Sequence, residues 1–233
     1  MRTVAGILAM AVGIGLLSTV DAADSNRVVA IDVLLRVDAA TAEKARAVNQ
    51  QLRKAYSRGY SFDAAHLPHI TLVQRYVRTQ DFEAIFAAVA KVVQTTALKD
   101  LEAPVSRFHS TPWDDVSLMA FQIDATPELR AFEQKIVDAV EPFAVSGGTA
   151  DAFAVAAGDL PVGKATIAAV EKFVPASSGN RFSPHVTLGA APKEVVDGLS
   201  RKQLEKFTIK PEGVAIYQLG NFGTAQKKLW PSK

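Results

Sequence analysis

Two stretches of this chain, Pro68–Leu72 (PHITL) and Pro184–Leu188 (PHVTL), share one pattern. Each contains a histidine and a threonine two residues apart within an apolar run. Side chains at positions i and i+2 of a β-strand point to the same face of a sheet. The pattern therefore predicts two strands, each presenting an imidazole beside a hydroxyl on one face and apolar side chains on the other.

The segments around these two stretches alternate between strand-like and helix-like patterns. Thr41 and Thr126 are the expected N-caps of the first and third helices. A loop over residues 175–180 is expected to lead into the second motif. Strands are expected at residues 28–37, 69–77, 101–108, 116–124, 213–219 and 224–230, helices at 41–56, 81–94, 127–140 and 195–207, and a weaker strand and helix up to residue 173.

The order of strands and helices around the first motif is roughly repeated around the second, although no repeat of residue identity is visible. We interpret this duplicated order as an α+β arrangement. We therefore expect two similar lobes, related by an approximate two-fold axis, that close over a shared central cleft carrying both motifs.

The N-terminal segment, residues 1–22, has the pattern of an export signal. Arg2 supplies a positive charge, an apolar run follows over residues 4–17, and small residues end the segment at Ala22. The alternative is an uncleaved membrane anchor, because the run approaches the roughly 17 residues that span a bilayer. We expect cleavage, a periplasmic or secreted protein without stable membrane insertion, and a single bilobal domain over residues 23–233.

Composition excludes several kinds of site. The chain has no cysteine, so disulfides, thiol nucleophiles and cysteine metal ligands are absent. Zinc would need three or four ligands, and no His-x-x-x-His pattern is present. No nucleophile elbow, P-loop or dinucleotide fingerprint occurs. The net charge of +2 is too balanced for a general polyanion trap. We expect no metal, no cofactor and a monomer.

A third His-x-Thr string occurs at His109-Ser110-Thr111, so the tripeptide alone is a weak signal. Residues 110–115 read as a turn, which sets this string apart from the two motif strands. A single histidine is more often a half-buried residue bonded to a backbone carbonyl than a catalytic group. The repeated Pro-His-x-Thr-Leu context favours function for His69, Thr71, His185 and Thr187.

Further residues near the motifs are candidate substrate contacts. Strict alternation puts Arg75 on the face of His69 and Thr71, within reach of a phosphate, with an exposed strand-end arginine as the alternative. Arg181 precedes the second motif in a segment that can close over substrate. The candidate base-stacking platforms, each alternatively a core residue, are Tyr217, Phe182 and Trp113.

The two motifs together resemble those of the two-histidine (2H) phosphoesterase superfamily, which includes the 2′,5′ RNA ligase and cyclic phosphodiesterase families. The tail over residues 214–220 (VAIYQLG) is similar to that family's closing strand. The resemblance spans nearly the whole mature chain, but only the motifs are specific. It implies a bilobal fold in which each lobe is an antiparallel sheet backed by helices. It also implies metal-independent reactions at 2′,3′-cyclic or 2′,5′-linked phosphodiesters.

The sequence thus predicts a cyclic phosphodiesterase acting on a nucleotide or an RNA-end cyclic phosphate. One histidine would take a proton from water and the other would donate one to the leaving ribose oxygen. Both threonine hydroxyls would hold the non-bridging phosphate oxygens. Two alternatives stay open: a non-catalytic periplasmic binder of a nucleotide or another phosphorylated ligand, and an RNA-joining enzyme, which would need a longer basic groove.

Overall fold

The computed structural model describes residues 26–63 and 65–231. The expected export signal, residues 1–22, lies outside these residues. Within the described part of the chain, none of the helices has the length and apolar character that crossing a membrane requires.

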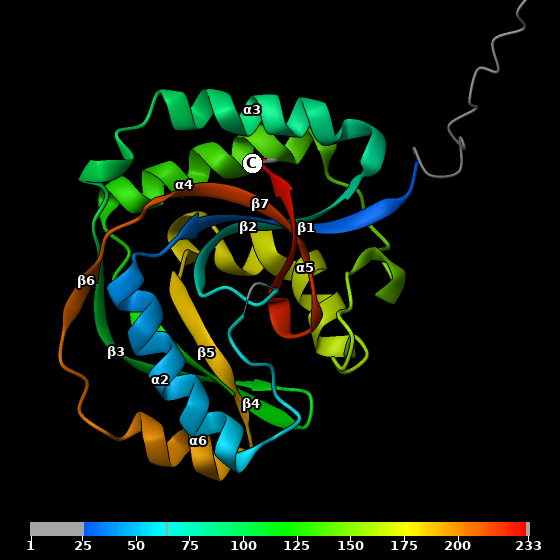
Figure 1. Ribbon diagram of the computed structural model, residues 1–233. Helices are drawn as coiled ribbons and strands as arrows, with labels where there is room; N and C mark the ends of the chain where they lie inside the picture. Colours follow the sequence, from blue (N-terminus) through cyan, green and yellow to red (C-terminus); the bar gives the residue numbers. More distant parts are fainter. Residues whose placement is uncertain (1–25, 64, 232–233) are drawn as a thin grey trace, which may run out of the picture.

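Two four-stranded antiparallel sheets form the framework (Figure 1). The first has the order β2-β1-β7-β8, from β1 (Val28–Arg36), β2 (His69–Arg78), β7 (Gly213–Leu219) and β8 (Ala225–Trp230). The second has the order β5-β4-β3-β6, from β3 (Ala103–Trp113), β4 (Val116–Ile123), β5 (His185–Ala191) and β6 (Phe207–Ile209). The α+β class is confirmed, and the expected two lobes are compatible with this arrangement. Each motif histidine opens an edge strand.

The helices tie the two sheets together. They are α2 (Ala39–Ala55), α3 (Phe82–Gln94), α4 (Pro127–Val140), α5 (Lys164–Ser177) and α6 (Lys193–Ser200). Helix α2 follows β1 of the first sheet but packs on β5 of the second, and α4 follows β4 of the second sheet but packs on β2 of the first. Figure 1 shows α3 beside α4, and α2 crossing in front of β5. Helices α2 and α4 therefore each cover the sheet that does not contain the strand before them.

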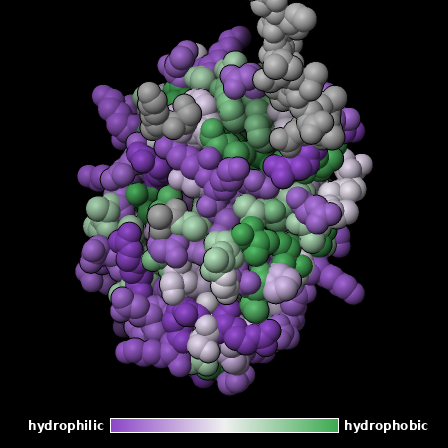
Figure 2. Space-filling model, turned by 45° about the vertical axis from the view of Figure 1, so that its right-hand side comes forward, coloured by the Kyte–Doolittle hydropathy of each residue, from purple (hydrophilic) through white to green (hydrophobic). Residues whose placement is uncertain are grey.

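One apolar core runs through both sheets. It includes fully buried side chains of both motif strands, such as Ile70 and Leu72 in β2 and Val186 and Leu188 in β5. On the face shown in Figure 2, hydrophilic side chains predominate and hydrophobic ones occupy a smaller area. Among the described residues, Val155 is the one large hydrophobic side chain that is exposed. Most large apolar side chains are thus buried between the two sheets and their helices.

Several element boundaries differ from the sequence predictions. Asp38, not Thr41, caps α2: its Oδ1 accepts the Thr41 backbone N–H at 2.8 Å. The Thr126 cap of α4 is confirmed. Strand β3 continues to Trp113, because Pro112 lies at a position where its missing N–H is tolerated. Helix α5 continues through Pro175 to Ser177, which replaces part of the expected loop. The weaker strand before α5 does not form among the described residues, and α6 ends at Ser200, before the expected end of the last helix at residue 207, where β6 begins.

Candidate functional site

One cavity of about 320 Å³ brings the two motifs together. His69 and Thr71 of β2 and His185 and Thr187 of β5 all line it. Helix α5 supplies another wall, since residues from Thr166 to Ser177 also line this space. The expectation that each motif presents its histidine and threonine on the same face is therefore met in both strands.

Both motif histidines are held in the same orientation. His69 Nδ1 lies 2.7 Å from the carbonyl oxygen of Leu67, and His185 Nδ1 lies 2.9 Å from that of Ser183. A carbonyl oxygen only accepts hydrogen bonds, so each Nδ1 must carry the proton and donate it. Nε2 is then the ring nitrogen that gains or loses a proton in each histidine. The residue two positions before each histidine thus fixes its tautomer.

A buried carboxylate, Asp32 in β1, lies behind the first motif. Its side chain is 0 % exposed, its Oδ2 accepts the Thr71 hydroxyl at 2.8 Å, and His69 Nε2 lies 3.3 Å from the same oxygen. No described group donates to Oδ1, which is also buried. Asp32 is not among the site residues that the sequence patterns predict. The signal was present, because it is the one charged residue within the apolar run of residues 28–35.

The surroundings of the two histidines push their protonation in opposite directions. Burial alone would lower the pKa of His69, but the hydrogen bond and negative charge of Asp32 outweigh it and raise the pKa. His185 is exposed at the cavity surface, yet the protein around the ring removes water, and this desolvation, with the charges of His109 and His69, lowers its pKa. His69 therefore keeps its proton to a higher pH than His185 does.

Each motif strand contains a bulge directly after its threonine. In β2, Val73 pairs with Val33 and Thr71 with Leu34, which leaves Leu72 as an extra residue. In β5, Leu188 is the extra residue, since Gly189 pairs with Met119 and Thr187 with Ala120. A bulge interrupts the alternation of side chains along a strand. Residues beyond it therefore face opposite to what strict alternation predicts.

The β2 bulge corrects the predicted position of Arg75. Gln74, not Arg75, lines the cavity with His69 and Thr71. Arg75 points to the other face, where its Nε and Nη2 donate to Glu141 at 3.0 and 2.6 Å. The prediction that Arg75 shares the motif face is wrong, because Leu72 adds one residue to the strand.

The other three predicted substrate contacts also lie outside the cavity lining. Tyr217 is 5 % exposed and packs with Leu34, Ala215 and Leu67. Phe182 is 5 % exposed and belongs to the main core, while Arg181 is exposed beyond the end of α5. Both aromatic rings, Tyr217 and Phe182, are core residues, which is the alternative that their sequence pattern left open. Of the predicted stacking platforms, Trp113 does line the cavity, with its Nε1 donating to Thr166 Oγ1 at 3.3 Å.

The third His-x-Thr string also faces this cavity. His109 and Thr111 lie in β3, not beside a turn, and both line the same space as the two motifs. The predicted turn over residues 110–115 is wrong for 110–113, because β3 pairs with β4 as far as Trp113 and Val116. Burial and the charge of Arg107 lower the pKa of His109. The alternation of residues 109 and 111 was the signal for this placement.

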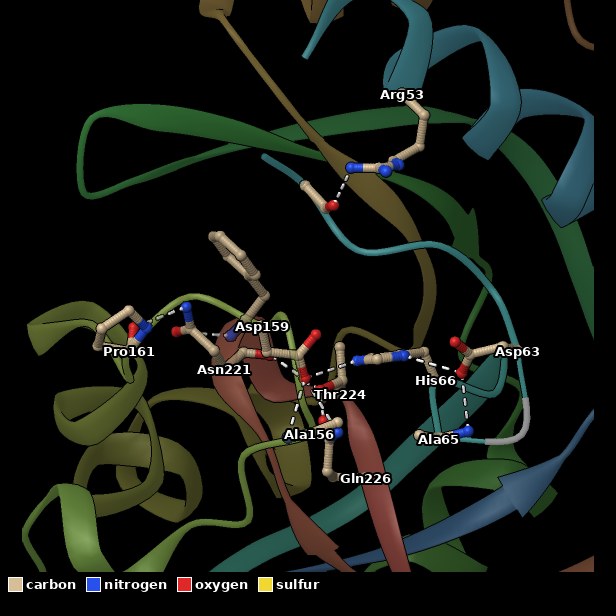
Figure 3. Close-up of polar contacts among 12 residues, drawn as sticks. Arg53, Asp63, Ala65, His66, Ala156, Asp159, Pro161, Asn221, Thr224 and Gln226 are labelled. Atoms are coloured by element: carbon tan, nitrogen blue, oxygen red, sulfur yellow. Dashed lines mark hydrogen bonds and ion pairs between the residues drawn. The ribbon is translucent and has the colours of Figure 1, made fainter. Parts of the chain in front are cut away.

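The fourth histidine, His66, is occupied on both ring nitrogens. Figure 3 shows it between Asp63 and Asp159, with Nδ1 2.9 Å from Asp63 Oδ1 and Nε2 3.2 Å from Asp159 Oδ2. Asp159 Oδ2 also accepts from Gln226 Nε2 at 3.0 Å. These contacts tie the segment before β2 to the loop before α5 and to β8. They support the chain segment whose Leu67 carbonyl orients His69.

In residues 26–63 and 65–231, no three imidazole or carboxylate side chains are grouped as metal ligands are. The sequence matches no model of a known protein family, and a search of curated proteins finds no significant match. The chemistry of the site is therefore inferred from its residues alone.

Proposed function

We propose that the protein is a metal-independent phosphodiesterase that hydrolyses 2′,3′-cyclic, or related 2′,5′-linked, phosphodiesters of nucleotides or RNA ends. The observation that carries the proposal is the pair of histidines with opposite pKa shifts in one cavity. Acid–base catalysis of hydrolysis needs one proton acceptor and one proton donor at the same time. This pair supplies both in the pH interval between the two pKa values.

The duplicated geometry supports a two-lobed site related by an approximate two-fold axis. The sheet orders correspond strand by strand: β2 to β5, β1 to β4, and β7 to β3. In both motif strands, the histidine Nδ1 is hydrogen-bonded to the carbonyl two residues earlier, and a bulge follows the threonine. Two matched imidazoles facing one cavity suit in-line displacement at phosphorus, where one proton leaves the attacking water and another reaches the departing oxygen.

Asp32 breaks this symmetry. Asp32 pairs with Gln74 beyond the β2 bulge, and Leu118 pairs with Ala190 at the corresponding place beyond the β5 bulge. A leucine there gives His185 no counter-ion. The productive state, protonated His69 with neutral His185, is then the majority state between the two pKa values, and the reverse state is rare.

The proposed reaction follows from these states. Neutral His185 Nε2 takes a proton from water as the water oxygen attacks phosphorus. The bond between phosphorus and one ribose oxygen breaks, and His69 Nε2 gives its proton to that oxygen. The Thr187 hydroxyl, which has no hydrogen-bond partner among the described residues, donates to a non-bridging oxygen. The Thr71 hydroxyl is committed to Asp32, so its main role is to hold the carboxylate beside His69.

The test is turnover of 2′,3′-cyclic nucleotides by purified protein in the presence of a chelator. We expect ring opening in the wild type and a loss of roughly 10²- to 10⁴-fold in both His69→Ala and His185→Ala. Thr187→Val removes one oxyanion donor and should cost about 10²- to 10³-fold. The exposed Thr208 of β6 provides the matched control, Thr208→Val, with full activity.

Four results would contradict the proposal. Activity that survives in either alanine variant would exclude the paired histidines, and activity lost with the chelator would indicate a required metal. Tight nucleotide binding without turnover, in a protein with intact circular dichroism, would favour the alternative of a periplasmic binding protein. Joining of RNA ends in place of ring opening would favour the ligase-like alternative.

A further inference from the structure

The third His-Thr pair, His109 and Thr111, lies on β3, two strands away from the second motif on β5. Thr187 of β5, Ala120 of β4 and His109 of β3 form one row across three neighbouring strands. Adjacent strands are about 4.8 Å apart, so Thr187 and His109 are separated by about 10 Å across the sheet. His109 therefore lies in the same cavity but two strands away from Thr187, a position suited to the next group of an extended substrate.

The sheet surface between them is open because Ala120 is small. On the first sheet the corresponding residue is Leu34, which pairs with Thr71 on one side and Ala215 on the other. There the surface is filled, since Leu34, Ala215 and Tyr217 are buried together with Leu67 against them. The cavity therefore extends over β4 and β3 of the second sheet and not over β7 of the first.

The charges around this extension favour an anion. No carboxylate is among the cavity-lining side chains, and the exposed Lys172 of α5 is the lining residue with a permanent positive charge. The exposed Thr111 contributes a hydroxyl from β3, and His109 contributes an imidazole. A cation, a hydroxyl and an imidazole that line one cavity without an acidic side chain suit the non-bridging oxygens of a phosphodiester.

We propose that His109, Thr111 and Lys172 form a subsite for a second phosphate, the internucleotide phosphate next to the scissile one. The preferred substrate is then an RNA end of two or more nucleotides that terminates in a 2′,3′-cyclic phosphate, rather than a free cyclic mononucleotide. This inference rests on the proposed function, because the cyclic phosphate occupies the space between His69 and His185.

Three substrates separate charge from size: a 2′,3′-cyclic mononucleotide, the dinucleotide with the same cyclic end, and that dinucleotide with an uncharged methylphosphonate linkage. We expect kcat/KM to be at least about tenfold higher for the charged dinucleotide than for the mononucleotide, the usual effect of one charge-assisted hydrogen bond. The methylphosphonate analogue should lose most of this advantage. An advantage retained by the analogue would assign the preference to base contacts and overturn the phosphate subsite.

Substitutions in the proposed subsite test which residues cause the preference for the charged dinucleotide. Lys172→Gln and Thr111→Val should each reduce the ratio of dinucleotide to mononucleotide kcat/KM, with the lysine change lowering the slope of log(kcat/KM) against log[salt] by roughly 0.7. His109 is left unchanged in this test, because its charge also acts on His185. Lys135→Gln, on the exposed face of α4, is the matched control and should keep the wild-type ratio.

Failure of this inference differs from failure of the proposed function. Equal kcat/KM for the mononucleotide and the charged dinucleotide would overturn the subsite and leave the phosphodiesterase intact. Absence of turnover on all three substrates would refute the proposed function. In that case calorimetric titration with a dinucleotide 3′-phosphate decides the subsite: it stands if binding weakens in Lys172→Gln and with the neutral linkage, and it falls if neither change matters.

Discussion

Replacing Asp32 by asparagine should make the proposed acid fail selectively at alkaline pH. The substitution keeps the size of the side chain and can still accept the Thr71 hydroxyl, but it removes the charge that holds the proton on His69. Without that charge, only desolvation and the Leu67 carbonyl act on the ring, and the main cause of its raised pKa is gone.

The geometry sets the size of the effect. Two unit charges 3.3 Å apart attract by about 5 kcal/mol at an effective dielectric constant of 20. Most of this is offset by the cost of burying the two charges, which amounts to several kcal/mol per ion. A net value of about 1.5–3 kcal/mol, typical of a hydrogen bond to a charged group, remains. At about 1.4 kcal/mol per factor of ten, kcat/KM at pH 8 should fall about 10- to 150-fold.

The assay is the pH profile of kcat/KM on a 2′,3′-cyclic nucleotide for Asp32→Asn, the wild type and the exposed control Asp115→Asn. We expect the loss to be smaller at pH 6 than at pH 8, because a lower pH favours protonation of His69 in the variant, and we expect the alkaline limb to move to lower pH. Asp115→Asn should match the wild type throughout. An equal loss at pH 6 and pH 8 would refute the reasoning, because it would indicate a structural role for Asp32.

Three further outcomes are expected. Because the bulge turns Arg75 away from the cavity, Arg75→Gln should keep kcat/KM within about twofold, and a tenfold rise in KM would contradict that placement. Gly148→Ala should destabilise the protein by at least about 1–3 kcal/mol in denaturant unfolding, since an added Cβ would lie 2.2 Å from the buried Tyr76 ring. Its control is Gly198→Ala in α6, where an added Cβ meets open space, and this variant should stabilise the protein by about 0.5–1 kcal/mol. The raised pKa of His69 should add stability that is fully present below about pH 6.5 and is lost as pH rises through the folded-state pKa. Asp32→Asn should remove this dependence. A difference in unfolding free energy between the two proteins that stays constant from pH 6 to 9 would disprove it.

The local parts of the site were readable from the sequence. Period-two alternation placed His69 with Thr71 and His185 with Thr187, since each pair precedes the bulge in its strand. Alternation failed for Arg75, because one extra residue reverses every side chain beyond it. The bulge has no glycine or proline marker in β2, so the sequence offered no sign of it.

The long-range parts were not readable. The contact of Asp32 with His69 depends on the register between β1 and β2, which a helix and a loop separate in the sequence. The exchange of α2 and α4 between the sheets depends on tertiary packing that local patterns do not encode. His109 was set aside because Pro112 suggested a turn, whereas pairing with β4 keeps the strand extended through that proline.

Opposite protonation of the two motif histidines is the claim on which the mechanism depends. Long-range ¹H–¹⁵N NMR of the histidine rings, recorded from pH 5 to 9 on the free protein, measures both pKa values and both tautomers. The account predicts that His69 titrates above and His185 below the ordinary histidine value of about 6.5, with the Nδ1–H tautomer in each neutral ring. A His69 that titrates at or below His185 would contradict it.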